Sequence, residues 1–344
     1  MALAWTPSAR LKQVALERAQ PLAASLELTY RCNWRCVFCY NPRHHDRRGL
    51  SGAEWLTVLD GLRTLGSLYV ALTGGEPLTH PDFLAIARGA RERAFALRIL
   101  TNGALVTDAL AAEIAVLRPL AVELSLHGAT AETHDRATAT PGSFDSMRRG
   151  LDRLLSRNVP VVLKTPLTHL NEAEMDGMRR IADGCGVPWR VDPVLTPRDD
   201  GDAGPLAYRA SPEAVSRMFR ELAALGQLPH EERAKGGTNC GLGRTTIAVD
   251  PEGNVFPCLQ WRRAPLGNVR ETPLREMWAG SEERLAAATV ARAANDRMAE
   301  AGPALASFPF CPALALQRTG DPLRPDESHL EQAEIAARIR LDPR

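Results

Sequence analysis

The sequence lacks the features that would place it in a membrane or on a nucleic acid. Its 344 residues contain no apolar run long enough to span a bilayer, and Met1–Trp5 has none of the basic residues that open a secretory signal. The formal net charge is +1 and only 5% of residues are aromatic, which disfavours a charged or stacking surface for nucleic acid. We therefore expect a cytoplasmic protein whose partners are neither nucleic acids nor membranes.

Cysteine is scarce, and its distribution disfavours the common structural uses of that residue. Three of the seven cysteines, Cys32, Cys36 and Cys39, follow a C-x3-C-x2-C spacing. Disulfides are disfavoured because cytoplasmic thiols stay reduced. Structural zinc needs four ligands and no second C-x2-C pair follows, although His44 and His45 leave a Cys3His site open. Three thiolates can instead hold three irons of a cubane iron–sulfur cluster and leave its fourth iron open to a small molecule.

What the sequence does contain is a regular alternation of short apolar runs and longer amphipathic runs from residue 24 to about residue 225. This alternation predicts six βα units, with parallel strands and helices outside them. Strands are expected at residues 25–30, 69–73, 97–101, 121–126, 159–165 and 189–195, and helices at 52–64, 81–93, 108–117, 143–157, 171–184 and 212–225. The periodicity alone fits either an open, partial barrel or a doubly wound sheet.

Polar residues end or follow every one of these strands. The cysteine run follows the first strand, the sequence Thr73-Gly-Gly-Glu-Pro77 ends the second, and the others carry Asn102, Ser125 with His127, Lys164, and residues 190–193. Function on parallel sheets lies at the carboxyl ends of the strands, so these residues form one candidate site. The two glycines permit positive φ and a close backbone approach, and the glutamate offers a carboxylate suited to an ammonium group.

The cysteine run, with Phe38 just before its last cysteine, resembles the signature of radical S-adenosylmethionine (SAM) enzymes, and the resemblance extends over about residues 22–320. It favours the partial (β/α)6 barrel of TIM type. It implies that Cys32, Cys36 and Cys39 hold a [4Fe–4S] cluster whose open iron binds the amino and carboxylate groups of SAM. Phe38 would then lie against the adenine.

The same resemblance implies further SAM-binding residues. The turn formed by Gly74, Gly75, Glu76 and Pro77 would hold the SAM amino group through its backbone and its glutamate. Ser125 matches a position that meets the ribose or the carboxylate of SAM, and Lys164 and Val191 lie near positions that meet the ribose and the adenine.

Three other residues each have two interpretations. Arg136 resembles an arginine near the SAM carboxylate, but it could equally form a surface salt bridge. Asn102 either lines the cavity or only serves its turn. His127 is either a catalytic acid–base group or, as the better interpretation, a buried structural histidine.

A second group of cysteines follows a linker expected at residues 226–239. Cys240 precedes a hairpin at residues 245–258 that ends on Cys258, and Cys311 follows two expected helices at 273–279 and 281–300. This region resembles SPASM, an auxiliary-cluster extension, or its shorter form, twitch. A full SPASM extension has seven cysteines, so the three here imply at most one auxiliary [4Fe–4S] cluster, completed by a ligand that is not identified. Three buried cysteines without a cluster are the alternative.

These features predict five segments. They are an N-terminal segment (1–22), a radical SAM partial barrel (23–225), the linker (226–239), a small α+β SPASM/twitch-like domain (240–322) and a C-terminal helix and tail (323–344). Cys185, at the end of an expected helix, is interpreted as a structural thiol.

The resemblance implies an oxidoreductase that cleaves SAM to a 5′-deoxyadenosyl radical, which abstracts a substrate hydrogen. A flavodoxin- or ferredoxin-type reductant would supply the electron. SPASM and twitch enzymes often modify ribosomally made peptides, so peptide oxidation or cross-linking is the first hypothesis. Only about twenty residues precede the first strand, so we expect no leader-binding domain and consider a separate leader-binding protein as a partner.

Two alternatives stay open. The first is a radical SAM enzyme that acts on a small molecule, such as a sugar, a nucleotide or a tetrapyrrole side chain. The second is a non-catalytic iron–sulfur protein that transfers electrons or senses redox state. The Gly-Gly-Glu-Pro turn disfavours this second alternative, because an electron carrier needs no ammonium-binding turn.

Overall fold

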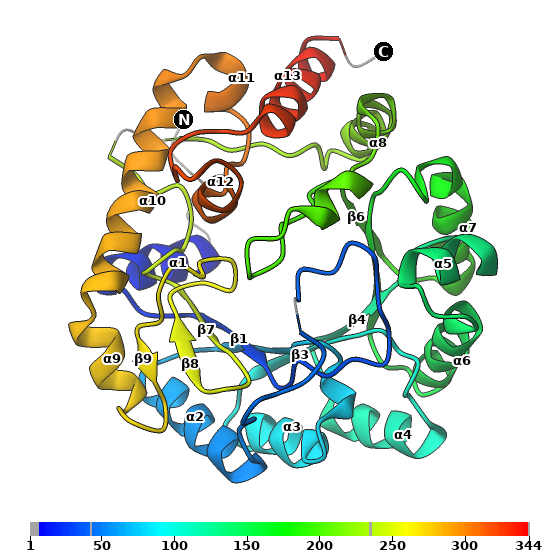
Figure 1. Ribbon diagram of the computed structural model, residues 1–344, viewed down its shortest axis with the longest axis vertical. Helices are drawn as coiled ribbons and strands as arrows, with labels where there is room; N and C mark the ends of the chain where they lie inside the picture. The colour runs from blue at the N-terminus through cyan, green and yellow to red at the C-terminus, as the bar shows by residue number, and fades with distance from the viewer. Residues whose placement is uncertain (1–6, 42, 234–235, 343–344) are drawn as a thin grey trace.

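The computed structural model describes residues 7–41, 43–233 and 236–342. Within them the chain forms one nine-stranded sheet in the order β6-β5-β4-β3-β2-β1-β7-β8-β9, curved around a central cavity with helices on its outer side (Figure 1). Residues 1–6 of the predicted N-terminal segment, 234–235 of the predicted linker and 343–344 of the predicted tail lie outside the described residues.

Six strands pair in parallel, each with its neighbour in the sequence. They are β1 Ala23–Glu27, β2 Tyr69–Thr73, β3 Ala96–Thr101, β4 Ala121–Ser125, β5 Val161–Pro166 and β6 Trp189–Asp192. A doubly wound sheet would reverse its strand order within the βα units, whereas β1 to β6 follow one another across the sheet in a single direction. The prediction of an open, partial (β/α)6 barrel is therefore confirmed.

The predicted helices form within a few residues of their expected bounds. They are α2 Gly52–Thr64, α3 Phe83–Glu92, α4 Asp108–Leu117, α6 Ser143–Leu155, α7 Met175–Cys185 and α8 Pro212–Ala224. Local capping accounts for this agreement. Ser51 and Glu54 form a capping box at the start of α2, and Ser211 caps α8 directly before Pro212.

Other helical segments are additions to the prediction. They are α1 Pro7–Arg18, α5 Ala131–Thr138 and the short turns η1 Pro77–Thr79 and η3 Gly204–Tyr208, whereas η2 Glu172–Glu174 forms the start of the helix predicted at 171–184. The eight residues of α5 carry hardly any apolar side chains, so no stripe marks the helix in the sequence. Tertiary contacts fix it instead, because the Glu174 carboxylate accepts hydrogen bonds from the backbone of Ala129 and Thr130 just before it.

The extension continues the main sheet. Strand β7 Thr246–Val249 pairs in parallel with β1, and β8 Asn254–Phe256 and β9 Gly267–Asn268 add antiparallel strands beyond it. The helices that follow are α9 Leu274–Gly280, α10 Glu282–Glu300, α11 Pro303–Ala306, α12 Pro312–Thr319 and α13 Glu327–Leu341. The last of these packs against α8 and covers the open side of the barrel (Figure 1). None of the described helices combines the length and the apolar character that a membrane span requires.

Candidate functional site

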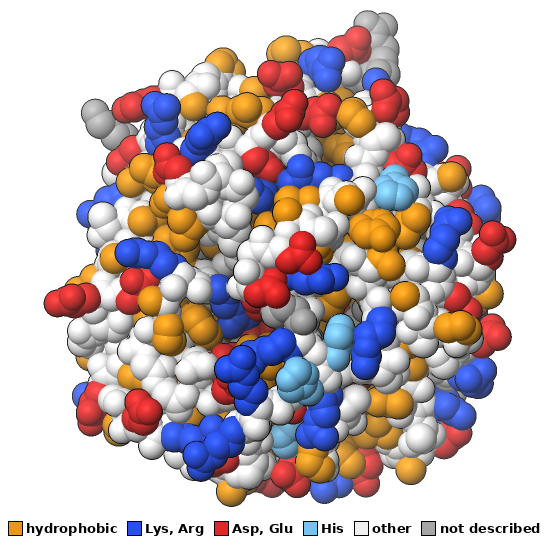
Figure 2. Space-filling model, viewed as in Figure 1, with side chains coloured by type: hydrophobic (Ala, Val, Ile, Leu, Met, Phe, Trp, Pro, Cys, Tyr) orange, Lys and Arg blue, Asp and Glu red, His pale blue; other side chains and the backbone are white. Residues whose placement is uncertain are grey.

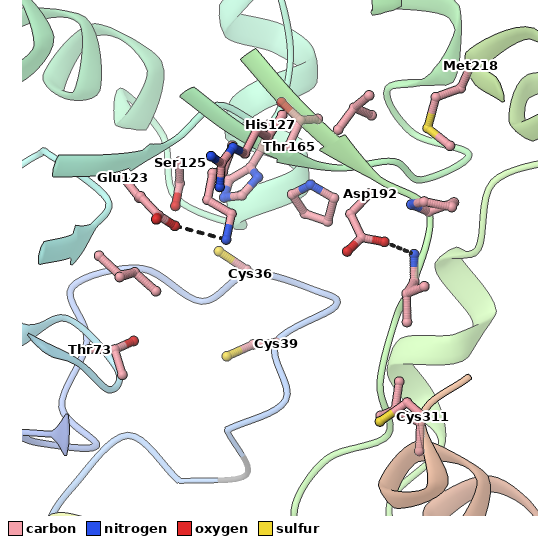
Figure 3. A pocket seen from close by; sticks show the side chains of 18 of the residues that line it. Cys36, Cys39, Thr73, Glu123, Ser125, His127, Thr165, Asp192, Met218 and Cys311 are labelled. Atoms are coloured by element: carbon pink, nitrogen blue, oxygen red, sulfur yellow. Dashed lines mark hydrogen bonds and ion pairs between the residues drawn. The ribbon is translucent and has the colours of Figure 1, made fainter. Parts of the chain in front are cut away.

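The carboxyl ends of the parallel strands open into a cavity of about 1040 Å³ (Figure 3). Its walls come from the cysteine loop, from strands β2 to β6, and from α8, α12 and α13. The predicted site residues that line it are Cys32, Cys36, Cys39, Gly74, Gly75, Glu76, Asn102, Ser125, Lys164, Val191 and Cys311. Residues from seven separate segments of the sequence thus face one space, as expected for the carboxyl end of such a barrel.

The cysteine loop is held by its backbone. The Arg35 and Val37 amides donate to the carbonyls of Thr138 and Ala137 at the end of α5, 3.0 Å away in both cases. Asn102 reaches the loop from the end of β3, where its side-chain amide donates to Asn33 Oδ1 at 2.7 Å. The side chain of Asn102 thus contacts the cysteine loop as well as its own turn.

The three thiols of this loop are close enough to affect one another. Burial raises the pKa of Cys32 to about 11, and the charge of Cys39 adds to that rise. The pKa of Cys36 is raised well above its usual value by burial and by both neighbouring thiols. Such thiols lose their protons only when a cation offsets the charge, so this donor set suits an iron–sulfur cluster. Among the described residues no three Cys, His, Asp or Glu side chains are grouped to hold a single metal ion.

The Gly-Gly-Glu turn packs directly on the base of the cysteine loop. The Gly75 amide donates to Thr29 O at 2.7 Å and the Glu76 amide to Arg31 O at 2.8 Å. A Cβ atom at Gly75 would lie 2.4 Å from Arg31 O, and Gly74 has a φ of +128°. Only glycine fits this approach. The carbonyls of Gly74 and Gly75 accept no hydrogen bond from any described residue, so they stay available to an ammonium group.

The Glu76 carboxylate is more enclosed than the sequence suggested. Its side chain accepts hydrogen bonds from Thr101 Oγ1 and the Asn102 amide, both at 2.7 Å, and from the Leu78 amide at 3.1 Å. The residue is 1% exposed, and burial raises its pKa to about 7 in spite of these donors. The Glu76 side chain therefore links the turn after β2 to the end of β3 through its own hydrogen bonds.

Charged side chains form a network on the sheet side of the cavity. Buried Glu123 on β4 pairs with Lys164 Nζ on β5 at 3.0 Å and with Arg98 on β3. Burial lowers the pKa of Lys164, and the nearby Arg98 and Arg190 lower it further. In Figure 3 a dashed line marks the ion pair of Glu123, which lies beside Ser125 on the side facing Cys36. Glu123 was not a predicted site residue, although a lone carboxylate inside an apolar strand is a readable signal of a buried partner.

Two predicted SAM contacts lie away from the cavity lining. The Phe38 ring packs edge-on against His127, with 5.1 Å between the ring centroids. Arg136 is exposed and donates to Leu170 O at 3.2 Å, and it forms no ion pair with any described residue. The surface salt bridge expected as one interpretation of this arginine is therefore not formed with any described residue, and its contact with SAM stays a prediction. Pro77 is buried at the start of η1 and stiffens the turn behind Glu76.

His127 lines the cavity at the end of β4. It lies in an aromatic group with Trp34, Phe38 and His134. Burial lowers the pKa of His127 well below its usual value, and lowers that of His134 to about 4. Both rings are therefore neutral at neutral pH, which fits a structural histidine better than a group that must carry a proton.

The part of the cavity lined by α8 and by the segments around α12 and α13, which we call its apolar half, is largely apolar. Met218 and Phe219 of α8 face Phe308 and Phe310, which precede α12. The buried Arg318 pairs with Asp326 at 3.1 Å on the same side. None of these residues was predicted, because no motif surrounds them and only the packing of α13 on α8 brings them to the barrel.

The three cysteines of the extension lie near one another across the hairpin, α10 and α12. Cys258 and Cys311 pack against a small apolar cluster made of Leu242, Trp261, Ala287, Ala291 and Ala313. Burial raises the pKa of Cys311 to about 12, and the charges of Cys258 and Cys240 add to the rise. Of the three, Cys311 lines the cavity, opposite Cys36 and Cys39 (Figure 3). Cys185 lies elsewhere, at the end of α7, with its sulfur 3.8 Å from Arg148 Nη1.

Family comparisons agree with this geometry. The model of the radical SAM superfamily matches residues 26–182, and the model of the SPASM iron–sulfur cluster-binding domain matches residues 240–300. The first match contains the cysteine loop, the Gly-Gly-Glu turn and the ends of β3 to β5. The second contains Cys240 and Cys258 but ends before Cys311.

Curated relatives have several different names. Mycofactocin maturase MftC of Mycobacterium tuberculosis is 31% identical over 69% of this chain, and the chain spans 64% of that relative's length. The AdoMet-dependent heme synthase of Methanosarcina barkeri is 28% identical, and the alignment covers 78% of this chain and 85% of the length of that relative. The PqqA peptide cyclase of Ruegeria pomeroyi is also 28% identical, and the alignment covers 75% of this chain and 74% of the length of that relative.

Solved structures share the fold at low sequence identity. Streptococcus suis SuiB bound to the precursor peptide SuiA aligns with a TM-score of 0.64 at 13% identity, over 82% of this chain and 72% of that one. Native anSMEcpe with bound AdoMet and the Cp18Cys peptide aligns with a TM-score of 0.70 at 14% identity, over 94% and 98% of the two chains.

Proposed function

Because the chain belongs to the radical SAM superfamily and carries a SPASM domain, we propose that it is an enzyme that cleaves SAM reductively and oxidises or cross-links a ribosomally synthesised peptide. One observation carries this proposal. The three closely spaced thiols and the free carbonyls of the Gly-Gly-Glu turn line the same cavity, at the carboxyl ends of neighbouring strands. An electron carrier would have no need of the second feature.

When bound, the [4Fe–4S] cluster and SAM supply the one-electron chemistry. In this proposal the chain holds the cluster with Cys32, Cys36 and Cys39, and the carbonyls of Gly74 and Gly75 accept hydrogen bonds from the SAM ammonium group. Glu76 fixes that turn against the end of β3. Ser125, Lys164 and Val191 line the space beyond it, where the rest of SAM would lie. The C-terminal helices close the open side of the barrel and keep water from the reacting atoms.

Two observations support a peptide as the substrate. The relatives include proteins named as a maturase and a peptide cyclase, and SuiB shares the fold and has been solved with its precursor peptide. The cavity also reaches Cys311, so a substrate placed in it lies between the catalytic cysteines and the auxiliary ones. A redox centre on the far side of a substrate favours a net oxidation, because it can accept an electron. A separate leader-binding protein remains part of this proposal.

A second candidate rests on the heme synthase relative, which this chain covers over 85% of its length. A tetrapyrrole side chain is a small-molecule substrate of the kind that the apolar half of the cavity could enclose. This candidate predicts binding of a porphyrin to the purified protein in the absence of any peptide.

The test begins with the protein reconstituted anaerobically with iron and sulfide, and 5′-deoxyadenosine is measured after addition of SAM and dithionite. The wild type is expected to form it and the Cys32/Cys36/Cys39→Ala variant is not. A precursor peptide encoded beside the gene is then added and its mass followed, with a porphyrin substrate tested in parallel. A peptide mass change supports the first candidate, and a porphyrin product supports the second. If the wild-type protein binds iron but forms no 5′-deoxyadenosine, the result supports the alternative of a non-catalytic electron carrier.

A further inference from the structure

The cysteine loop carries an unusual concentration of positive charge on its solvent side. Five arginines lie within residues 31–48, against a single aspartate, although the whole chain has a net charge of only +1. We call these arginines, Arg31, Arg35, Arg43, Arg47 and Arg48, the arginine rim. Lys and Arg side chains, with histidines among them, gather below the centre of the face in Figure 2, where Figure 1 shows this loop crossing the mouth of the barrel.

Part of the rim is neutralised by carboxylates and part is not. Arg31 pairs with Asp46 at 3.2 Å and Arg43 with Glu252 at 3.0 Å. Arg35, Arg47 and Arg48 are exposed, and their guanidinium groups pair with no carboxylate among the described residues, although the Arg47 backbone amide donates to Glu252 at 3.4 Å. Exposed, unpaired guanidinium groups on one face produce a field that reaches about one Debye length into solution, or about 8 Å at physiological salt.

Acidic side chains do lie nearby. The loop after β6 contributes Asp200 and Asp202, and the second of these pairs with Arg198 at 2.8 Å. The Asp199 amide on the same loop donates to Tyr40 O at 3.0 Å, so this loop borders the rim. Its acids are offset in part by Arg198, and the net excess of positive charge stays with the cysteine loop.

One member of the rim, Arg35, lies directly against the backbone of the cysteine loop. Arg35 Nη1 donates to Cys32 O at 2.6 Å and to Trp34 O at 2.8 Å, so its guanidinium lies on the backbone of the loop itself. The same loop thus turns its cysteines to the cavity and its arginines to the solvent.

We propose that the arginine rim is the docking surface for a small acidic protein that carries one electron at a time to the catalytic cysteine site. This inference rests on the proposed function, which needs one electron for each SAM cleaved. The reduced carrier loses that electron and dissociates in its oxidised form. An acidic partner is favoured by charge complementarity, and a position outside the cysteine loop brings its redox centre close without entry into the cavity.

A substrate peptide with acidic residues is the competing occupant. The rim lies on the opposite side of the loop from the cavity that would hold the reacting part of a peptide. A peptide bound there would have to pass around the loop to reach the cavity, so the placement favours the electron carrier.

The test compares two reductants in two charge-reversal variants. Arg47→Glu/Arg48→Glu alters the rim without touching a residue that lines the cavity. Arg292→Glu/Arg297→Glu makes the same change in net charge at exposed positions on α10. Deoxyadenosine formation is measured with dithionite, and separately with a reduced acidic flavodoxin, at low and at physiological salt. Binding of the oxidised flavodoxin is followed by calorimetry.

The rim variant is expected to lose about tenfold or more of its flavodoxin-driven rate at low salt, together with most of its flavodoxin binding, and to keep its dithionite-driven rate. The α10 variant should match the wild type in every assay. A neutral Arg47→Gln/Arg48→Gln variant should lie between the two, and it replaces the charge reversal if that variant does not fold.

The outcomes separate this inference from the proposed function. Equal flavodoxin binding and equal flavodoxin-driven rates in the wild type and the rim variant overturn the docking surface, even if SAM is cleaved. No deoxyadenosine from the wild type with dithionite overturns the proposed function, and calorimetry then still tests the surface. Unchanged flavodoxin binding with weakened binding of an acidic precursor peptide would assign the rim to the peptide.

Discussion

Cys32, Cys36 and Cys39 lie within eight residues of one loop, whereas Cys240, Cys258 and Cys311 are spread over 72 residues. The first group lies at the carboxyl ends of the sheet, between polar turns and an exposed arginine rim. In the second group, Cys258 and Cys311 pack against a small apolar cluster and Cys240 is exposed, and of the three only Cys311 lines the cavity. The first group needs one loop to be held in place, and the second needs the hairpin and two helices to pack correctly.

This difference determines which structural changes would disrupt each group of cysteines. The catalytic group depends on the close fit of the Gly-Gly-Glu turn under its loop, so one misplaced atom there affects all three thiols. The auxiliary group depends on helix packing far from the barrel strands, so it can be lost while the barrel and its first site persist.

The largest effect is expected from removing the auxiliary cysteines. The Cys240/Cys258/Cys311→Ala variant should bind about four irons per chain where the wild type binds about eight, and it should still release 5′-deoxyadenosine with dithionite. Iron and sulfide analysis after anaerobic reconstitution checks this. About four irons in both proteins would show that the extension holds no cluster. The auxiliary cysteines would then not form a second cluster site to compare with the catalytic one.

The next effect concerns the turn beneath the catalytic loop. Gly75→Ala places a Cβ 2.4 Å from Arg31 O and 2.5 Å from Tyr30 O, and neither backbone atom can move without moving the cysteine loop. We expect a loss of about 3 kcal/mol or more in the free energy of unfolding, and the loss of the catalytic iron. Urea denaturation of the iron-free protein and iron analysis measure the two effects.

A matched glycine provides the control. Gly184→Ala lies in α7, with no heavy atom within 4 Å of the new Cβ, and should change stability by no more than about 1 kcal/mol, in the stabilising direction. If the two variants are equally stable, the close fit of the turn is not what holds the first site.

The smallest effect is the contribution of Glu76, in the catalytic region, to the pH dependence of stability. The pKa of Glu76 rises from 4.5 to about 7 because of burial. Between those values the folded chain holds a proton that the unfolded chain has released, so the free energy of unfolding falls as pH rises. For this one group the fall is at most about 3 kcal/mol.

Comparing the iron-free wild type with Glu76→Gln isolates this contribution, because Asp199 and other buried carboxyls titrate in both proteins. The wild type should lose stability more steeply from about pH 4.5 to about pH 7, as followed by denaturation at each pH. Parallel curves for the two proteins would mean that Glu76 stays ionised in the fold.

Much of the fold could be predicted from local patterns. The helices Gly52–Thr64 and Asp108–Leu117 have their predicted bounds, because capping residues mark their starts. Helix α5 could not be predicted, because its few apolar residues give no period. The site shows the same division. The residues at the strand ends line the cavity as expected, while Arg136 and Phe38 point elsewhere, since the orientation of a side chain after a strand depends on its neighbours.

The sequence by itself determined the spacing of the catalytic cysteines, the glycine turn one strand later and the order of the six βα units. These depend on neighbours in the chain and on a repeating period. Only the tertiary structure decided that β7 would pair with β1 and that α13 would close the barrel. It also brought Cys311 to the cavity that holds Cys36 and Cys39. Contacts between residues more than one hundred positions apart are fixed by packing, which no local pattern records.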